Sequence, residues 1–194
     1  MKIDRYKPPK SSFLSVDKDI ATIKELFINN ERLCRLLFRT NKDPLNTQNL
    51  TQDEKIELFE KRYIRNVPKV IIDEECLNYV VINFTNFIPN ATNTEFRDNA
   101  IVIEIICHYD QWQIKDGMLR PYRIAGEIDS MLNEARLSGI GVLNFIGAEQ
   151  VLLTPEYGGI HLTYLAVHGE DDKIKFANPA DEEKFLEEFV TNVL

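Results

Sequence analysis

The spacing of apolar residues divides the chain into a helical first third and a strand-rich remainder. Apolar side chains recur at three- and four-residue intervals from Ile20 to Leu37, which predicts a helix over about 18–38. Residues 41–50 then have the polar pattern of a loop. Thr51 and Glu54 stand at the spacing of a capping box, which predicts a second, shorter helix over about 52–62.

After Pro68 the pattern changes to short runs of apolar and β-branched residues, which is typical of strands. The predicted strands are 70–72, 79–84, 100–109, 142–153 and 160–168. Long loops are predicted at 89–99 and 110–120, and a hairpin turn at 154–159. Two further helices are predicted, one from Pro121 to about 138 and one at the C-terminal end over 179–194.

The order of these elements is two helices, three strands, a helix, two strands and a helix. Adjacent groups of strands with a helix inserted between them favour an α+β fold, with a small, mostly antiparallel sheet flanked by helices. Residues 1–16 are basic and contain prolines, so we expect an extended basic arm. The rest, 17–194, is expected to form a single α+β domain that includes the N-terminal and C-terminal helices.

Composition and charge narrow the classes of function. The net charge of −8 argues against a general binder of nucleic acid or anionic membranes, and we expect no direct sequence-specific binding of nucleic acid. No apolar run is long enough for a membrane span or a signal peptide. The three cysteines form no CxxC motif, which favours a reducing, intracellular setting.

The segment Ile105 to Trp112, with the sequence IICHYDQW, is the strongest candidate for an active site because it places a thiol beside an imidazole. Side chains alternate along a strand, so Cys107 and His108 should point to opposite faces of the sheet. Cys107 lies in line with three isoleucines, as a core cysteine does. The sequence therefore predicts no catalytic residue, no metal site and no cofactor.

Apolar residues at loop positions are the better candidates for function. They are Trp112, Ile114, Met118 and Leu119 in the predicted loop 110–120, and Tyr157 at the tip of the predicted hairpin. Either they fold back over the edge of the sheet, or they form a partner surface, where such residues are over-represented. An acidic body with a basic arm suits contacts between subunits.

Residues 68–168 carry a resemblance to a known family. The strand pair VPKVIIDEE...NYVVINF is followed by the strand AIVIEIICHYD, the segment RPYRIAGEIDSMLN and the hairpin VLLTPEYGGIHLTYLAV. In the order and sequence pattern of these segments, the chain resembles the tail-terminator and head–tail joining (neck) proteins of tailed bacteriophages. The resemblance covers about half of the chain. It implies an α+β fold, no catalytic residue and assembly as a ring, typically a homohexamer, that caps the tail tube and docks the head connector.

The sequence thus predicts a structural virion protein of the phage neck, a ring-forming tail terminator that is not an enzyme. The expected partners are further copies of the chain in a hexameric ring, the tail tube protein and the head-completion or connector proteins. The protein would be assembled in the host cytoplasm and reside in the virion. The alternatives are a head-closure or adaptor protein of the same neck, a cytosolic adaptor that binds through the acidic C-terminal helix, and a non-viral enzyme or ligand-binding domain with a site built from Glu104, His108, His161 and Tyr164.

Overall fold

The computed structural model describes residues 16–60, 63–66, 77–89, 96–137 and 141–169. The helices are α1 (Val16–Asn29), α2 (Glu31–Phe38), α3 (Gln52–Glu60) and α4 (Arg120–Leu132). The strands are β1 (Ile64–Arg65), β2 (Asn78–Pro89), β3 (Phe96–His108), β4 (Arg136–Leu137), β5 (Gly141–Val142), β6 (Asn144–Leu152) and β7 (Tyr157–Gly169). The expected strand 70–72, the C-terminal helix 179–194 and all but the last residue of the arm 1–16 lie outside the described residues.

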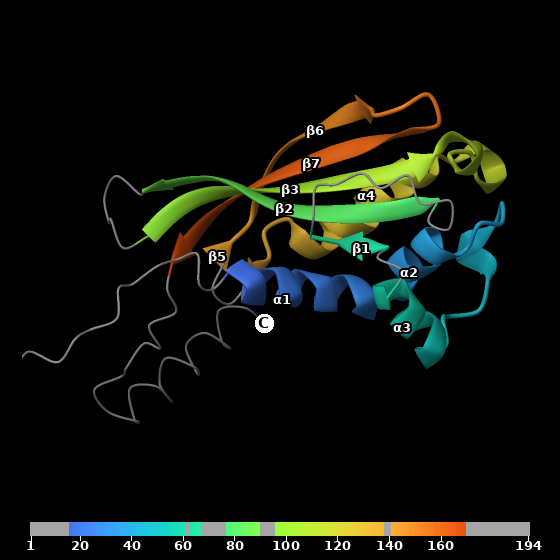
Figure 1. The fold of residues 1–194 in the computed structure, drawn as a ribbon, viewed down its shortest axis with the longest axis horizontal. Helices are drawn as coiled ribbons and strands as arrows, with labels where there is room; N and C mark the ends of the chain where they lie inside the picture. The colour runs from blue at the N-terminus through green and yellow to red at the C-terminus, as the bar shows by residue number, and fades with distance from the viewer. Residues whose placement is uncertain (1–15, 61–62, 67–76, 90–95, 138–140, 170–194) are drawn as a thin grey trace, which may run out of the picture.

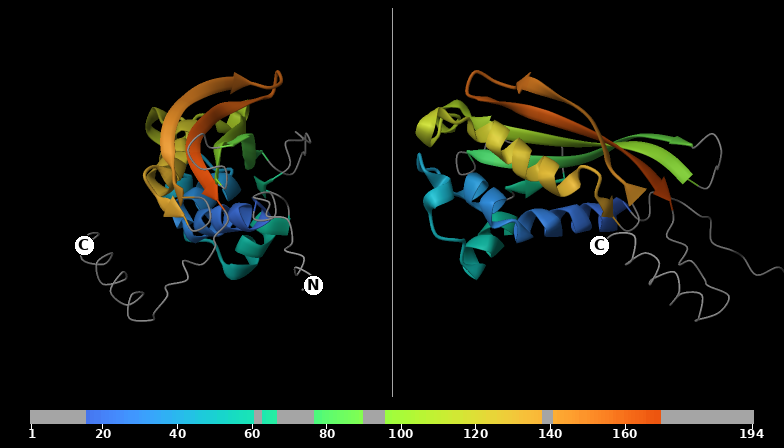
Figure 2. Two further views of the ribbon diagram at one scale, coloured as in Figure 1. Left: turned by 90° about the vertical axis from the view of Figure 1, so that its left-hand side faces the viewer. Right: turned by 180° about the vertical axis from the view of Figure 1, so that it is seen from behind.

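The strands form a five-stranded sheet in the order β1-β2-β3-β7-β6, and β4 pairs with β5 in a separate small sheet. Every neighbouring pair in the main sheet is antiparallel except β1 and β2, which are parallel. This confirms the predicted α+β fold with a mostly antiparallel sheet. The long strands twist strongly, so that β6 and β7 arch over the rest of the molecule (Figure 2).

One face of the sheet is covered by helices. Along β3 the residues Ile101, Ile103, Ile105 and Cys107 are all buried. Tyr164 of β7 pairs with Ile101, and its hydroxyl donates a hydrogen bond to Asp129 of α4 (2.9 Å). Because paired residues share a face, these residues define the helix face, and α4 lies across it (Figures 1 and 2). We call the opposite side, which contains Val102, Glu104 and His108, the second face.

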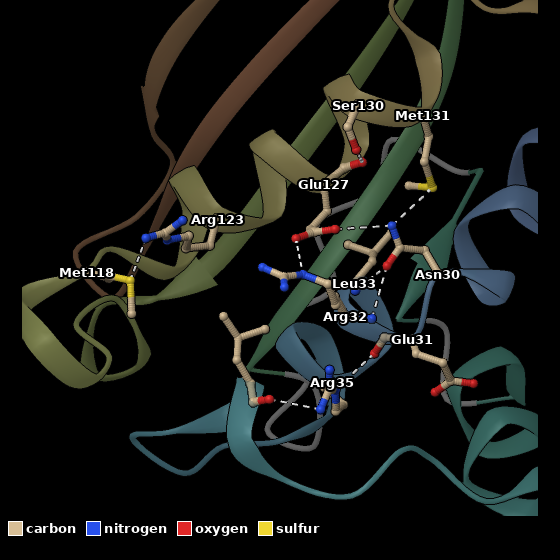
Figure 3. A network of polar contacts seen from close by, with 11 residues as sticks. Asn30, Glu31, Arg32, Leu33, Arg35, Met118, Arg123, Glu127, Ser130 and Met131 are labelled. Atoms are coloured by element: carbon tan, nitrogen blue, oxygen red, sulfur yellow. Dashed lines mark hydrogen bonds and ion pairs between the residues drawn. The ribbon is translucent and has the colours of Figure 1, made fainter.

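The predicted helix 18–38 is in fact two helices, because Asn30 leaves the helical conformation. Its backbone is extended, and its side-chain oxygen accepts hydrogen bonds from the backbone N–H groups of Arg32 and Leu33 (both 3.0 Å). Asn30 is therefore the N-cap of α2. Its amide nitrogen also donates to Glu127 of α4 (3.3 Å), and Glu127 pairs with Arg32 at 2.6 Å (Figure 3). The periodicity of apolar residues continues through Asn30, so this pattern does not show where one helix ends and the next begins.

The capping box predicted at the start of the next helix is confirmed. The backbone N–H of Thr51 donates to the Glu54 carboxylate (2.9 Å), and the N–H of Glu54 donates to the Thr51 hydroxyl (3.3 Å). The same carboxylate receives two hydrogen bonds from Arg39, which follows α2. α3 is thus both capped and tied to α2 at its first turn.

The other differences concern where elements end. α4 stops at Leu132 instead of near 138, because Glu134 has a positive φ of 61° that reverses the chain towards Leu143. The predicted strand 142–153 is divided into β5 and β6. β2 runs on to Pro89 and β3 begins at Phe96, so residues 89 and 96–99 of the predicted loop 89–99 belong to strands, whereas 90–95 lie outside the described residues.

Candidate interaction surfaces

The segment IICHYDQW is not a reactive cluster. Cys107 is fully buried on the helix face, and burial raises the pKa of its thiol to about 12, so it stays protonated at neutral pH. His108 lies on the second face, where its ring nitrogen accepts a hydrogen bond from the backbone N–H of Asp110 (3.2 Å). The predicted separation of thiol and imidazole is therefore confirmed, and Cys107 occupies a core position.

The following connection, residues 109–119, is held by one buried cation. The Arg120 guanidinium, only 1% exposed, donates to the backbone carbonyls of Leu36 (2.6 Å), Arg39 (2.7 Å) and Asn41 (2.9 Å), at and just beyond the end of α2. It also donates to the carbonyl of Gln111 (2.9 Å). The last carbonyls of a helix have no partner within the helix and carry partial negative charge. Arg120 therefore caps α2 from a distance and fixes the connection against it.

Two of the five predicted interface residues are buried in the core of the chain. Ile114 is 4% exposed, and its backbone N–H donates to the carbonyl of Met118 (2.9 Å). Tyr157 is 3% exposed and makes an edge-to-face contact with His108, with ring centroids 5.0 Å apart. Tyr157 was expected at a hairpin tip, but it is the first residue of β7, because the turn closes earlier, through hydrogen bonds of Leu153 and Thr154 to its carbonyl. For these two residues the structure shows the alternative in which the side chain folds back into the core, and not an exposed surface position.

The other three predicted interface residues are at least partly accessible. Trp112 is half-buried: its indole N–H donates to the carbonyl of Cys107 (3.1 Å), and its ring packs on Tyr109. Met118 is half-buried and its sulfur contacts Arg123 (Figure 3). Leu119 is 40% exposed. An interface role for these three residues stays a prediction.

The residues of the alternative enzymatic site are only partly brought together. Glu104 and His161 are opposite each other on the second face, with carboxylate and imidazole atoms 3.6 Å apart. Tyr164 lies on the helix face, and His108 is four residues along β3 from Glu104. Among the described residues, no group of three acidic, histidine or cysteine side chains could hold a metal ion. The arrangement is a cross-strand pair on a sheet surface.

The sequence did not single out the first half of β6, yet it carries an exposed apolar surface. β6 is an edge strand, and Ile146 lies at a register shift in its pairing with β7 and is 53% exposed. Phe145 beside it and Val142 of β5 are exposed as well, whereas the exposed Leu165 of β7 lies on the second face, because the adjacent Tyr164 lies on the helix face. We call Val142, Phe145 and Ile146 the β6 patch. Sequence alternation could not reveal it, because an edge strand and a central strand have similar patterns.

The opposite edge of the sheet is built differently. β1 pairs with β2 only at Val80 and Val81, and within the described residues the stretch from Asn83 to Thr85 has no strand partner on that side. A groove of about 830 Å³ follows this stretch, with Val16, Asp17 and Ile20 of α1 as its other wall. Glu104 and His161 also line it. We call it the β2 groove.

In the part of the chain that the structure describes, fold and surfaces define an α+β protein with a buried core and two unlike sheet edges. The family model of YomW matches residues 30–166, most of the chain, and the protein therefore belongs to the YomW family. The family takes its name from a gene of a Bacillus phage region, which makes this a phage-associated protein. A search of the curated proteins found no match. None of the helices that the structure describes has the length and hydrophobicity needed to cross a membrane.

Proposed function

We propose that the protein is a structural component of the phage neck that assembles into a ring, with the tail terminator as the specific role. Membership of a phage-associated family and the α+β fold are consistent with the resemblance to neck proteins. The observation that carries the proposal is the β6 patch, because an exposed apolar edge strand invites pairing with another chain unless something covers it.

The proposed occupant of the β6 patch is a second copy of the chain. A closed ring needs a heterologous contact, in which the patch of one copy meets a different surface of the next copy. Pairing of one β6 with another β6 would instead give a two-fold dimer. The mass of the assembled protein therefore separates the two arrangements.

The test is the mass in solution and the electron-microscope image of the purified full chain, alone and with tail tubes. We expect rings, or single copies that form rings on tube ends. A stable monomer or dimer that ignores tail tubes would contradict the proposal. Rings that bind head connectors and not tubes would contradict the terminator role and favour the head-closure alternative.

A matched pair of variants connects the ring to the β6 patch. Ile146→Lys should shift the protein to single copies, because it places a charge in the apolar contact. Ile56→Lys makes the same chemical change at a similarly exposed isoleucine (47%) on α3 and should leave the ring intact. Rings that survive Ile146→Lys would show that the patch is not the ring contact.

A further inference from the structure

We propose that the β2 groove receives the basic arm, residues 1–15, of a second copy of the chain as an added strand along β2. This inference concerns how subunits are joined, and it rests on the proposed function only because it requires that copies associate. Its evidence is independent of the β6 patch and consists of the backbone of β2, the shape of the groove and its charge.

Among the described residues, part of the outer edge of β2 has backbone hydrogen-bonding groups without a strand partner. Val80 donates its backbone N–H to the carbonyl of Tyr63, on the side of β1 (2.8 Å). In an antiparallel pair, alternate residues direct both backbone groups to the same side. Ile82 and Phe84 therefore direct their backbone groups away from β3, while Asn83 directs its groups to β3. The parallel pairing of Arg65 with Val81 uses the Ile82 N–H, so within the described residues the groups that face the groove are the Ile82 C=O and the N–H and C=O of Phe84. An extended segment can pair with these groups and leave the existing ladder intact.

The groove provides both walls that such a segment needs. β2 forms one wall, and the first turns of α1 form the other with Val16 and Ile20. In Figure 1 the N-terminal half of α1 runs past the end of β1, beneath β2. A second hollow of about 470 Å³ shares Asp17, Ile20 and Asn66 with the groove and continues along α1. A strand held between a sheet edge and a helix is a recurring mode of peptide recognition.

The charges of arm and groove are complementary. Residues 1–15 contain four basic side chains and one acidic side chain, whereas the whole chain has a net charge of −8. The two hollows are lined by the carboxylates of Asp17, Glu25 and Glu104, against the single ammonium of Lys24. Such complementarity selects a basic segment over the acidic segments of the same chain.

The arm that fills the groove is more readily supplied by a second copy than by the copy that contains the groove. α1 begins at Val16, which is itself part of the groove wall, so an arm from the same copy would have to reverse direction just before the helix. Residues 11–15 contain no glycine, asparagine, aspartate or proline, and their serines favour turns only weakly. An arm arriving from a neighbouring copy needs no reversal.

Mixed cross-linking identifies the source of the arm. One tagged copy carries Ser12→Cys, a second carries Thr85→Cys, and Cys76→Ser is present in both; Cys34 and Cys107 are fully buried. We expect an oxidative cross-link between the two copies, and none when Ile56→Cys replaces Thr85→Cys. A link found only within a chain that carries both Ser12→Cys and Thr85→Cys would overturn the proposal in favour of the chain's own arm.

Residue-resolved hydrogen exchange tests the added strand itself. We compare the full chain with a full chain in which Arg5, Lys7 and Lys10 are each changed to Glu. The amide of Phe84 should exchange at least about tenfold faster in the variant, whereas the amides of Ile82, bonded to β1, and of Asn83, bonded to β3, should not change. Equal exchange at Phe84 in both proteins would overturn the proposal.

The mass of each cross-linking sample keeps the two proposals distinguishable. Rings without a cross-link would overturn the arm inference and leave the proposed function standing. Single copies that form no rings, alone or on tail tubes, and that do not cross-link would contradict the proposed function, and the arm inference with it.

Discussion

The connection 109–119 and the strand β6 both carry large apolar side chains, but the two differ in how many of these side chains are exposed. In the connection, Ile114 is buried and Trp112 is half-buried, because Arg120 folds the segment against the end of α2. On β6, Ile146 and Phe145 stay exposed although they belong to a regular strand. An irregular segment can thus contribute buried side chains and a regular strand can carry exposed ones. Which of the two occurs depends on the elements that pack against the segment.

The largest predicted effect is at the centre of the connection. Arg120→Met should lower the free energy of unfolding by about 3–5 kcal/mol, because carbonyls of Leu36, Arg39 and Asn41 lose a donor. Chemical denaturation of the diluted protein measures this. Arg120→Lys keeps the charge but not the planar set of donors, so it should recover only part of the loss. A fully stable Arg120→Met protein would show that the connection does not depend on this residue.

Ile114 and Leu119 test the same contrast within the connection. Ile114→Ala should lower the free energy of unfolding by about 2–4 kcal/mol, because it opens a cavity among buried residues. Leu119→Ala, at a 40% exposed leucine in the same connection, is the matched control and should change stability by less than about 0.5 kcal/mol. Denaturation curves of both variants give the comparison, and equal losses would contradict the structural difference between the two positions.

The sequence predicted the fold class and the inert core more successfully than it predicted the surfaces. Strand alternation placed Cys107 and His108 on opposite faces, because side-chain direction in a strand is a local property. It could not identify the burial of Ile114, which depends on Arg120 reaching carbonyls some 80 residues away in the chain. Nor could it identify the β6 patch, because strand order within a sheet is set by long-range pairing.

Alkaline pH probes the core beneath the connection. The folded-state pKa of Cys107 is raised to about 12, while an unfolded cysteine titrates near about 8.5. The burial of the protonated thiol therefore contributes fully to the free energy of unfolding below about pH 8.5. This contribution is lost as the pH rises from there towards the folded-state pKa. Between pH 7 and pH 9.5, Cys107→Ala should lose about 1 kcal/mol less stability than the parent protein. Identical pH profiles of denaturation would contradict the burial of the thiol.

The smallest predicted effect is on the other side of the comparison, at Ile146. Its side chain is more than half exposed, so Ile146→Lys should change the free energy of unfolding of a single copy by less than about 0.5 kcal/mol. Ile106→Lys, at a buried isoleucine of β3, should prevent stable folding and serves as the contrasting control.

Association of copies stabilises a folded protein by an amount that grows with the logarithm of its concentration. The parent should therefore become more stable as its concentration rises, whereas the Ile146→Lys protein should not. Denaturation at two concentrations measures this, and a loss of stability at Ile146→Lys that is equal at both would assign Ile146 to the core of the subunit instead of to its contact with another copy.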